Sequence, residues 1–181
     1  MGTVFADVRA AWLKEFRATK AQIDAALAQL SDEQFRTRIA EGTNSCAAIV
    51  KHLAGNMRSR WTDWLTTDGE KPDRDREREF DADTEARPEL MRRYEAGWGL
   101  VFGAIDALTE ADLGRTVRIR GEPYTAAAAV ERQMAHYGYH AGQIQLIARI
   151  VHGNPGWTWH TVAPGASEAF NRAMAEKHGT P

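Results

Sequence analysis

The chain has 181 residues, and its 23 lysines and arginines nearly balance its 25 aspartates and glutamates, for a formal net charge of −2. This length suits one domain with a core of its own, so we expect a single domain over residues 1–181. The charge balance gives no electrostatic reason to expect a nucleic-acid or membrane partner, and no apolar run approaches the ~20 residues that span a bilayer.

The start of the chain and its cysteine content indicate a compartment. Met1 to Arg9 lacks the basic start and apolar core of a secretory signal. The single cysteine, Cys46, excludes an internal disulfide and fits a reducing environment. We therefore expect a cytoplasmic protein.

The first half of the chain predicts two long helices. Apolar residues recur at steps of three and four from about Thr3 to Leu30, which is the helical period. A second helix is predicted from a cap at Asn44–Ser45 through Leu65. The segment from Asp68 to Arg78 mixes charges of both signs, so we expect a solvated connection there.

The second half predicts two more long helices. The third should begin between Glu85 and Pro88, since proline suits a first helical turn. Residues 117–120 alternate apolar and basic before the break at 121–123, which favours a short extended crossover rather than a sheet. Thr125 is the expected cap of a fourth helix over 126–152, and residues 167–177 predict a last short helix.

Four long amphipathic helices without a true strand predict an all-α fold, a four-helix bundle. The connection between the third and fourth helices is too long for a tight hairpin, so we expect a long crossover there. The short helix should close the C-terminal end of the chain.

Three histidines predict a metal site. His136 and His140 are four residues apart, so on a helix they stand one turn apart on one face and can hold one ion. His52 lies in the second predicted helix and offers a third imidazole. Three neutral imidazoles would leave coordination positions open, as in catalytic sites. A histidine beside an apolar stripe can also be a hydrogen-bonded core residue, and this alternative stays open for each.

Other polar residues border the predicted site. Gln133 and Gln143 share the flank of the fourth helix that carries the histidines, and Asn56 follows His52 by one turn. Each can orient a ligand or make an ordinary core hydrogen bond. Tyr137 stands where the H-E-x-x-H motif has its general-base glutamate, so a peptide-hydrolysing zincin is not favoured.

These motifs resemble the DinB/YfiT-like metalloenzyme superfamily. Its members have a histidine in the second helix and a late helix with H-x-x-x-H followed by x-G-Q, here His52 and residues 136–143. Further segments that resemble one bacterial branch are 44–45, 51–56, 59–63, 68–72, 120–123 and 167–171. The resemblance implies a metal held by His52, His136 and His140. Ala141 stands where the superfamily often has an arginine, which puts a substrate role of that position in doubt.

Characterised members of this superfamily are thiol-dependent S-transferases and isomerases. The resemblance therefore implies a metal-dependent enzyme that uses a divalent ion (zinc, nickel or iron), a low-molecular-weight thiol and a small-molecule substrate. Arg60 and Arg132 are candidate anchors for an anionic thiol, although both also suit plain surface solvation. The alternatives are a hydrolase that uses a metal-bound water and a non-catalytic metal-binding dimer.

The tryptophan content indicates a partner face. The chain has six tryptophans, and Trp12, Trp61 and Trp64 fall on predicted helices whose outer faces are otherwise polar. Large aromatic residues near a surface commonly mark an interface. Because the superfamily often pairs its bundles, we expect a homodimer, with core filling as the alternative role of these rings.

Overall fold

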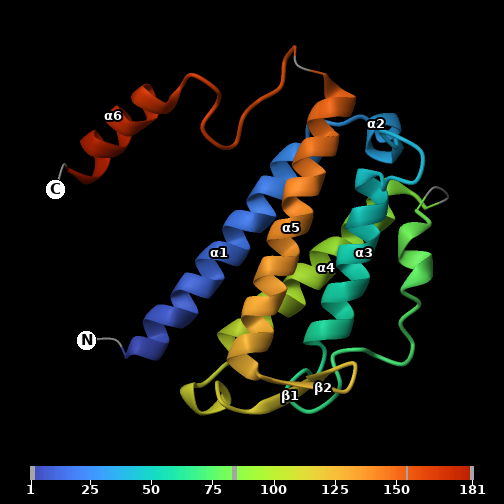
Figure 1. Ribbon diagram of the computed structural model, residues 1–181, viewed down its shortest axis with the longest axis vertical. Helices are drawn as coiled ribbons and strands as arrows, with labels where there is room; N and C mark the ends of the chain where they lie inside the picture. Colours follow the sequence, from blue (N-terminus) through green and yellow to red (C-terminus); the bar gives the residue numbers. More distant parts are fainter. Residues whose placement is uncertain (1–2, 83–84, 154, 180–181) are drawn as a thin grey trace.

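The computed structural model describes residues 3–82, 85–153 and 155–179 and is mostly helical (Figure 1). Four long helices make up most of the body. They are α1 (Val4–Leu27), α3 (Cys46–Trp61), α4 (Arg87–Asp106) and α5 (Ala126–His152). Shorter elements connect and follow them: α2 (Asp32–Arg36), η1 (Glu77–Phe80), η2 (Glu110–Asp112), β1 (Thr116–Ile119), β2 (Glu122–Thr125) and α6 (Ser167–His178).

Each long helix packs against two others. α3 lies against α4 and α5, and α1 lies against the opposite sides of the same two helices. The predicted caps hold α3 and α5 in place: Ser45 accepts a hydrogen bond from the Ala48 N–H, and Thr125 accepts one from the Ala128 N–H. α3 ends at Trp61, four residues before the predicted end at Leu65.

Aromatic rings fill the space between the long helices. Phe16 of α1, Trp98 of α4 and Tyr137 of α5 are at most 1% exposed, and their ring centroids lie 5.5–6.3 Å apart. The three tryptophans expected near the surface are also buried: Trp12 is 7%, Trp61 4% and Trp64 8% exposed. Their assignment to a partner face was therefore wrong, because they fill the core.

The crossover between α4 and α5 contains a true hairpin, contrary to the expected extended segment. β1 and β2 pair antiparallel, with Ile119 opposite Glu122, so Arg120 and Gly121 form a two-residue turn. Both turn residues have positive φ, 57° and 78°, as a type I′ turn requires. The Asp68 carboxylate accepts hydrogen bonds from both turn N–H groups, at 2.8 and 2.7 Å, and so links the hairpin to the segment that follows α3.

α6 is the last element, close to the predicted range, and stands apart from the long helices (Figure 1). None of its residues is buried. Among the helices that the structure describes, none combines the length and apolar character needed to cross a bilayer.

Candidate metal centre

Three histidine side chains from two helices converge on one point. His52 comes from α3, and His136 and His140 stand one turn apart on α5. The Nε2 atom of His136 lies 3.4 Å from that of His52 and 3.1 Å from that of His140. The three ligand atoms all lie within 4.8 Å of one another, so the predicted trio could hold one metal ion.

Two of the three separations between these nitrogen atoms fit a metal ion directly. Around a tetrahedral ion with metal–nitrogen distances of 2.0–2.1 Å, neighbouring ligand nitrogens lie about 3.3 Å apart. The two Nε2 separations given above straddle this value. Without an ion, three imidazole edges would meet with too few protons to link them all.

Two hydrogen bonds fix which nitrogen of the His52 and His140 rings faces the centre. His52 Nδ1 lies 2.9 Å from Glu79 Oε2, and His140 Nδ1 lies 2.8 Å from Gln143 Oε1. With the hydrogen on Nδ1, each ring donates to its oxygen partner and keeps a lone pair on Nε2. Gln143 is held in turn by donating from Nε2 to the Tyr139 hydroxyl at 3.0 Å.

The rings of α5 are uncharged at neutral pH. Burial and the neighbouring His140 and His52 lower the pKa of His136 to about 3. Burial and the nearby His52 lower the pKa of His140 to about 4, against a smaller opposing effect of the Gln143 hydrogen bond. His136 Nδ1 is buried and has no hydrogen-bond partner within the described part of the chain. Neutral imidazoles are the form that binds metal, so His136 and His140 are in the state that a divalent ion requires.

Glu79 supports the centre from behind His52, and sequence analysis missed it. Arg74 donates two hydrogen bonds to the Glu79 carboxylate, both at 2.7 Å. Burial opposes the ionisation of Glu79, but the hydrogen bonds from Arg74 and His52 outweigh it and keep its pKa below the usual range. The carboxylate packs against Gly55, where a Cβ would lie 2.7 Å from Glu79 Cδ. Phe80 stacks on the His52 ring with centroids 4.8 Å apart.

Glu79 directly follows the charged run of residues 68–78, which was expected to be a solvated connection. Part of that expectation was wrong, because the Arg74 side chain is only 2% exposed; Glu79, directly after the run, is also buried. The separation of 27 residues between His52 and Glu79 has no periodicity that could have linked them. The apolar Phe80 and Ala82 at the end of the run are the one local sign that the chain returns to the core.

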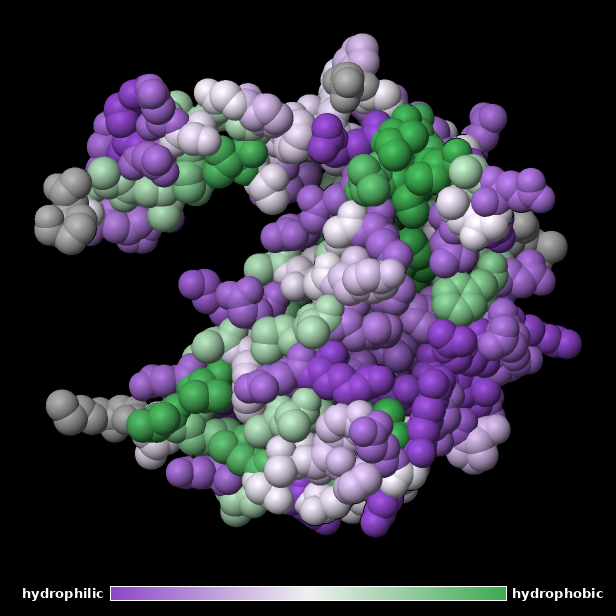
Figure 2. All heavy atoms as spheres, in the orientation of Figure 1, coloured by the Kyte–Doolittle hydropathy of each residue, from purple (hydrophilic) through white to green (hydrophobic). Residues whose placement is uncertain are grey.

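The histidines line a polar cavity of about 400 Å³ between α3, α5, the hairpin turn and the segment before α4. Hydrophilic side chains cover this part of the surface (Figure 2). The cavity is lined by Asn44, His52, Asn56, Arg60, Arg74, Arg76, Phe80, Arg120, Arg132, His136, Tyr139, His140 and Gln143.

Four of the five predicted neighbours of the site line this cavity: Asn56, Gln143, Arg60 and Arg132. The Asn56 side chain is already engaged, since its Oδ1 accepts a hydrogen bond from the Tyr137 hydroxyl at 3.2 Å. Arg60 is 6% exposed and binds the Gly69 carbonyl and, at 2.8 Å, the Glu70 carboxylate. Arg132 is exposed on α5, with its guanidinium 5.9 Å from the Tyr124 ring centroid.

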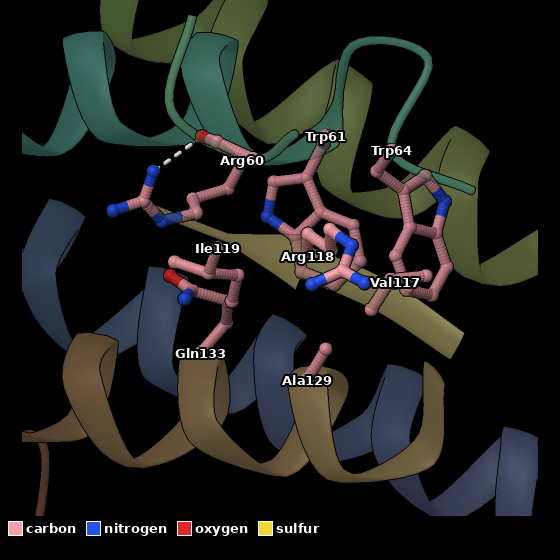
Figure 3. Close-up of a pocket in the computed structure, with 9 residues that line it drawn as sticks. Arg60, Trp61, Trp64, Val117, Arg118, Ile119, Ala129 and Gln133 are labelled. Atoms are coloured by element: carbon pink, nitrogen blue, oxygen red, sulfur yellow. Dashed lines mark hydrogen bonds between the residues drawn. The ribbon is translucent and has the colours of Figure 1, made fainter. Parts of the chain in front are cut away.

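Gln133 does not line the histidine cavity. It faces a separate cavity of about 10 Å³ between α5, α3 and β1, where Arg60 lies on the opposite wall (Figure 3). Neither amide atom of Gln133 has a hydrogen-bond partner among the described residues. A cavity of this size holds about one water molecule, so the Gln133 amide packs beside the site and can bind water there.

Other candidate ligands lie apart from the trio. Cys46 is fully buried, and burial raises the pKa of its thiol to about 12, so it is an inert core residue. His152 contacts the Gly153 carbonyl at 2.9 Å, while His160 and His178 are exposed.

The fold and the histidine trio define a mostly helical protein with a candidate metal centre between two of its long helices. The chain belongs to the family described as "Protein of unknown function (DUF1572)", which matches residues 6–166. This range includes all three histidines and Glu79. No curated protein matches the chain.

Proposed function

We propose that this protein is a metal-dependent enzyme of the DinB/YfiT-like superfamily. In this proposal the four long helices form the superfamily's bundle, and His52, His136 and His140 hold a divalent zinc, nickel or iron ion. The observation that carries the proposal is the convergence of three Nε2 atoms at the wall of a polar cavity. The resemblance of residues 136–143 to the superfamily motif supports the same assignment.

The site is suited to bind a ligand as well as an ion. Three protein ligands leave room for an exogenous one in a tetrahedral shell, and the cavity provides its approach. A divalent ion with neutral ligands keeps its full charge and can lower the pKa of a thiol or polarise a carbonyl. Glu79 and Gln143 would hold the His52 and His140 rings in register during this chemistry.

We propose a thiol S-transferase as the activity. A low-molecular-weight thiol enters the cavity and loses its proton to solvent. Its sulfur then forms a bond to an electrophilic carbon, and the leaving group departs with the bonding electron pair. The polar walls would orient the two reactants, and the ring contacts of Phe80 with His52 and of buried Tyr137 with His136 would restrict the movement of these two histidines.

Hydrolysis by an activated water is the less favoured alternative. It calls for a general base, and none of the described residues that line the cavity is an aspartate or glutamate. Glu79 lies behind His52, where Arg74 and the His52 ring already occupy its oxygens.

X-ray absorption on the metal-loaded protein, with and without 2-mercaptoethanol, tests the proposed activity. We expect a sulfur neighbour at the metal in the presence of the thiol, together with turnover in a screen of thiols with electrophiles. Metal loading with an unchanged coordination shell and no turnover would leave a non-catalytic metal-binding protein instead.

We further propose that the protein is a homodimer. With the tryptophans inside the core, the interface that we propose uses exposed apolar side chains of α5 and α6. Leu146 and Ile150 of α5 are 57% and 54% exposed, and Phe170 and Met174 of α6 are 47% and 41% exposed. Figure 2 shows hydrophobic side chains gathered over the C-terminal end of α5.

A further inference from the structure

The histidine cavity has an unbalanced charge on its walls. Five of its thirteen lining residues are arginines, and none of the described lining residues is an aspartate or glutamate. A divalent ion on the three imidazoles would raise the positive potential further.

Two of the five arginines are fixed parts of the wall. Arg74 is held by Glu79 and Glu70, and Arg60 by Glu70 and the Gly69 carbonyl. Their side chains are 2% and 5% exposed. Both charges are matched by carboxylates behind the wall, so these residues shape the cavity and have little left to offer a ligand.

The side chains of the other three arginines are exposed to solvent. Arg132 is exposed and forms no salt bridge with any residue in the described ranges. The Arg120 side chain is 54% exposed and shares Glu70, at 3.3 Å, with two other arginines. The Arg76 side chain is 46% exposed, and its partner Glu77, at 3.5 Å, is itself 89% exposed, which makes a weak pair.

Arg132 and Arg120 are placed to reach a ligand that also reaches the histidines. Arg132 precedes His136 by one turn of α5, which puts its Cα roughly 6 Å along the helix on the same face. Arg120 occupies the hairpin turn, and its backbone N–H donates to Asp68 in the segment that follows α3, so its backbone is held in place. The guanidinium group can bind a carboxylate or phosphate through two donors at once.

We propose that the substrate bound in this cavity carries an oxyanion, a carboxylate or a phosphate, that Arg132 and Arg120 hold while its reacting end lies at the three histidines. Arg76 adds a third cationic group to the lining of the cavity. The placement of the reacting end at the histidines depends on the proposed function, whereas the anion site depends only on the arginines. The volume of about 400 Å³ suits a metabolite-sized ligand. Arg60, expected from sequence as an anchor, is replaced in this role by Arg120.

A matched pair of thiols tests the proposal. The cobalt(II)-loaded protein is titrated with 4-mercaptobutyrate and with neutral 4-mercaptobutanol, and binding is followed through the sulfur-to-cobalt absorption band. We expect the carboxylate thiol to bind about 10-fold or more tightly, because charge-assisted hydrogen bonds to arginine are strong. Arg132→Gln and Arg120→Gln should each remove most of this preference.

Arg115→Gln is the control, because Arg115 is exposed outside the cavity and pairs only loosely with Asp112, at 3.7 Å. It should keep the full preference. Equal binding of the two thiols to the wild type would overturn the anion site. So would a preference that survives Arg132→Gln and Arg120→Gln, since the carboxylate would then be bound by cobalt itself.

A second readout separates the anion site from the thiol chemistry. If neither thiol produces the absorption band, the proposed transferase activity fails, and the anion site is then judged by calorimetry with inorganic phosphate. We expect phosphate to bind the metal-loaded wild type and to bind at least several-fold more weakly to Arg132→Gln. Absence of phosphate binding, or equal binding to both proteins, would overturn the proposal.

Discussion

At the scale of single residues, the Glu79 carboxylate decides how well His52 is prepared for a metal. It accepts the His52 Nδ1–H and is itself clamped by Arg74, so the ring cannot turn without breaking a buried network. Partners of this kind fix the tautomer and the orientation of a ligand. The position of the carboxylate depends on Gly55, which leaves it space.

Glu79→Gln should lower metal affinity about 10–100-fold, the usual effect of losing such a partner. The reason is that an amide holds the His52 ring less firmly and reduces the electron density on its ligating nitrogen. Competition with a chelator measures the affinity, and circular dichroism checks that the fold is kept. Glu77→Gln is the control, because the Glu77 side chain is 89% exposed, and equal affinities in the two variants would contradict the role of Glu79.

The pKa values of His136 and His140 predict how the stability of the metal-free protein depends on pH. Both folded-state pKa values, about 3 and about 4, lie below the value near 6.5 expected in the unfolded chain. Below pH 6.5 the unfolded state therefore binds more protons, so the free energy of unfolding falls as the pH falls from 6.5 toward 4.

Urea denaturation of the metal-free protein at steps from pH 7 to 5 measures this effect, in a range where most carboxylates are still ionised. His136→Gln removes one of the two groups, so its stability should fall less steeply over the same range. Equal slopes for the variant and the wild type would show that His136 is not held neutral in the folded state.

At the scale of elements, helix periodicity and capping residues predicted α1, α3, α4 and α5 well. Where a helix end differs from the predicted one, the cause is local. α3 stops at Trp61 because the chain turns at Asp63, which has a positive φ of 48°. The hairpin was missed because its four-residue strands carry little pattern, and because the Arg120–Gly121 turn is stabilised by Asp68, 52 residues earlier.

The contact between α3 and α4 depends on a glycine. A Cβ at Gly97 would lie 3.0 Å from the Cβ and Sδ atoms of Met57, whereas one at Gly99 would meet nothing within 4 Å. Gly97→Leu should therefore destabilise the protein by about 1–3 kcal/mol through overpacking. Gly99→Leu, its matched control, should be neutral or stabilising by up to ~1 kcal/mol through helix propensity. Urea denaturation of both variants decides, and equal stabilities would contradict the close packing of α3 on α4.

At the scale of the whole molecule, the histidine trio was predictable and the groups that support it were not. The i,i+4 spacing of His136 and His140 is read directly from the sequence, and His52 was a candidate from its place in a predicted helix, which the family resemblance then supported. Glu79, Arg74 and the hairpin turn reach the site through irregular chain, where no period relates a residue to its partner.

The proposed homodimer is tested by light scattering at micromolar concentration. We expect twice the chain mass of 20.2 kDa, because the apolar side chains exposed on α5 and α6 lose contact with water in the pair. Leu146→Glu together with Phe170→Glu should shift the mass toward the monomer. A wild-type mass near that of one chain would exclude the dimer at these concentrations.

Metal analysis of protein purified without a histidine tag or a metal column tests the central claim most directly. We expect about one divalent transition-metal ion per chain in the wild type. His136→Ala or His140→Ala should remove most of it, because either change leaves two of the three converging imidazoles. His178→Ala, which alters an exposed histidine on α6, should retain it. The same metal content in all three variants would contradict the assignment of His52, His136 and His140 as the metal centre.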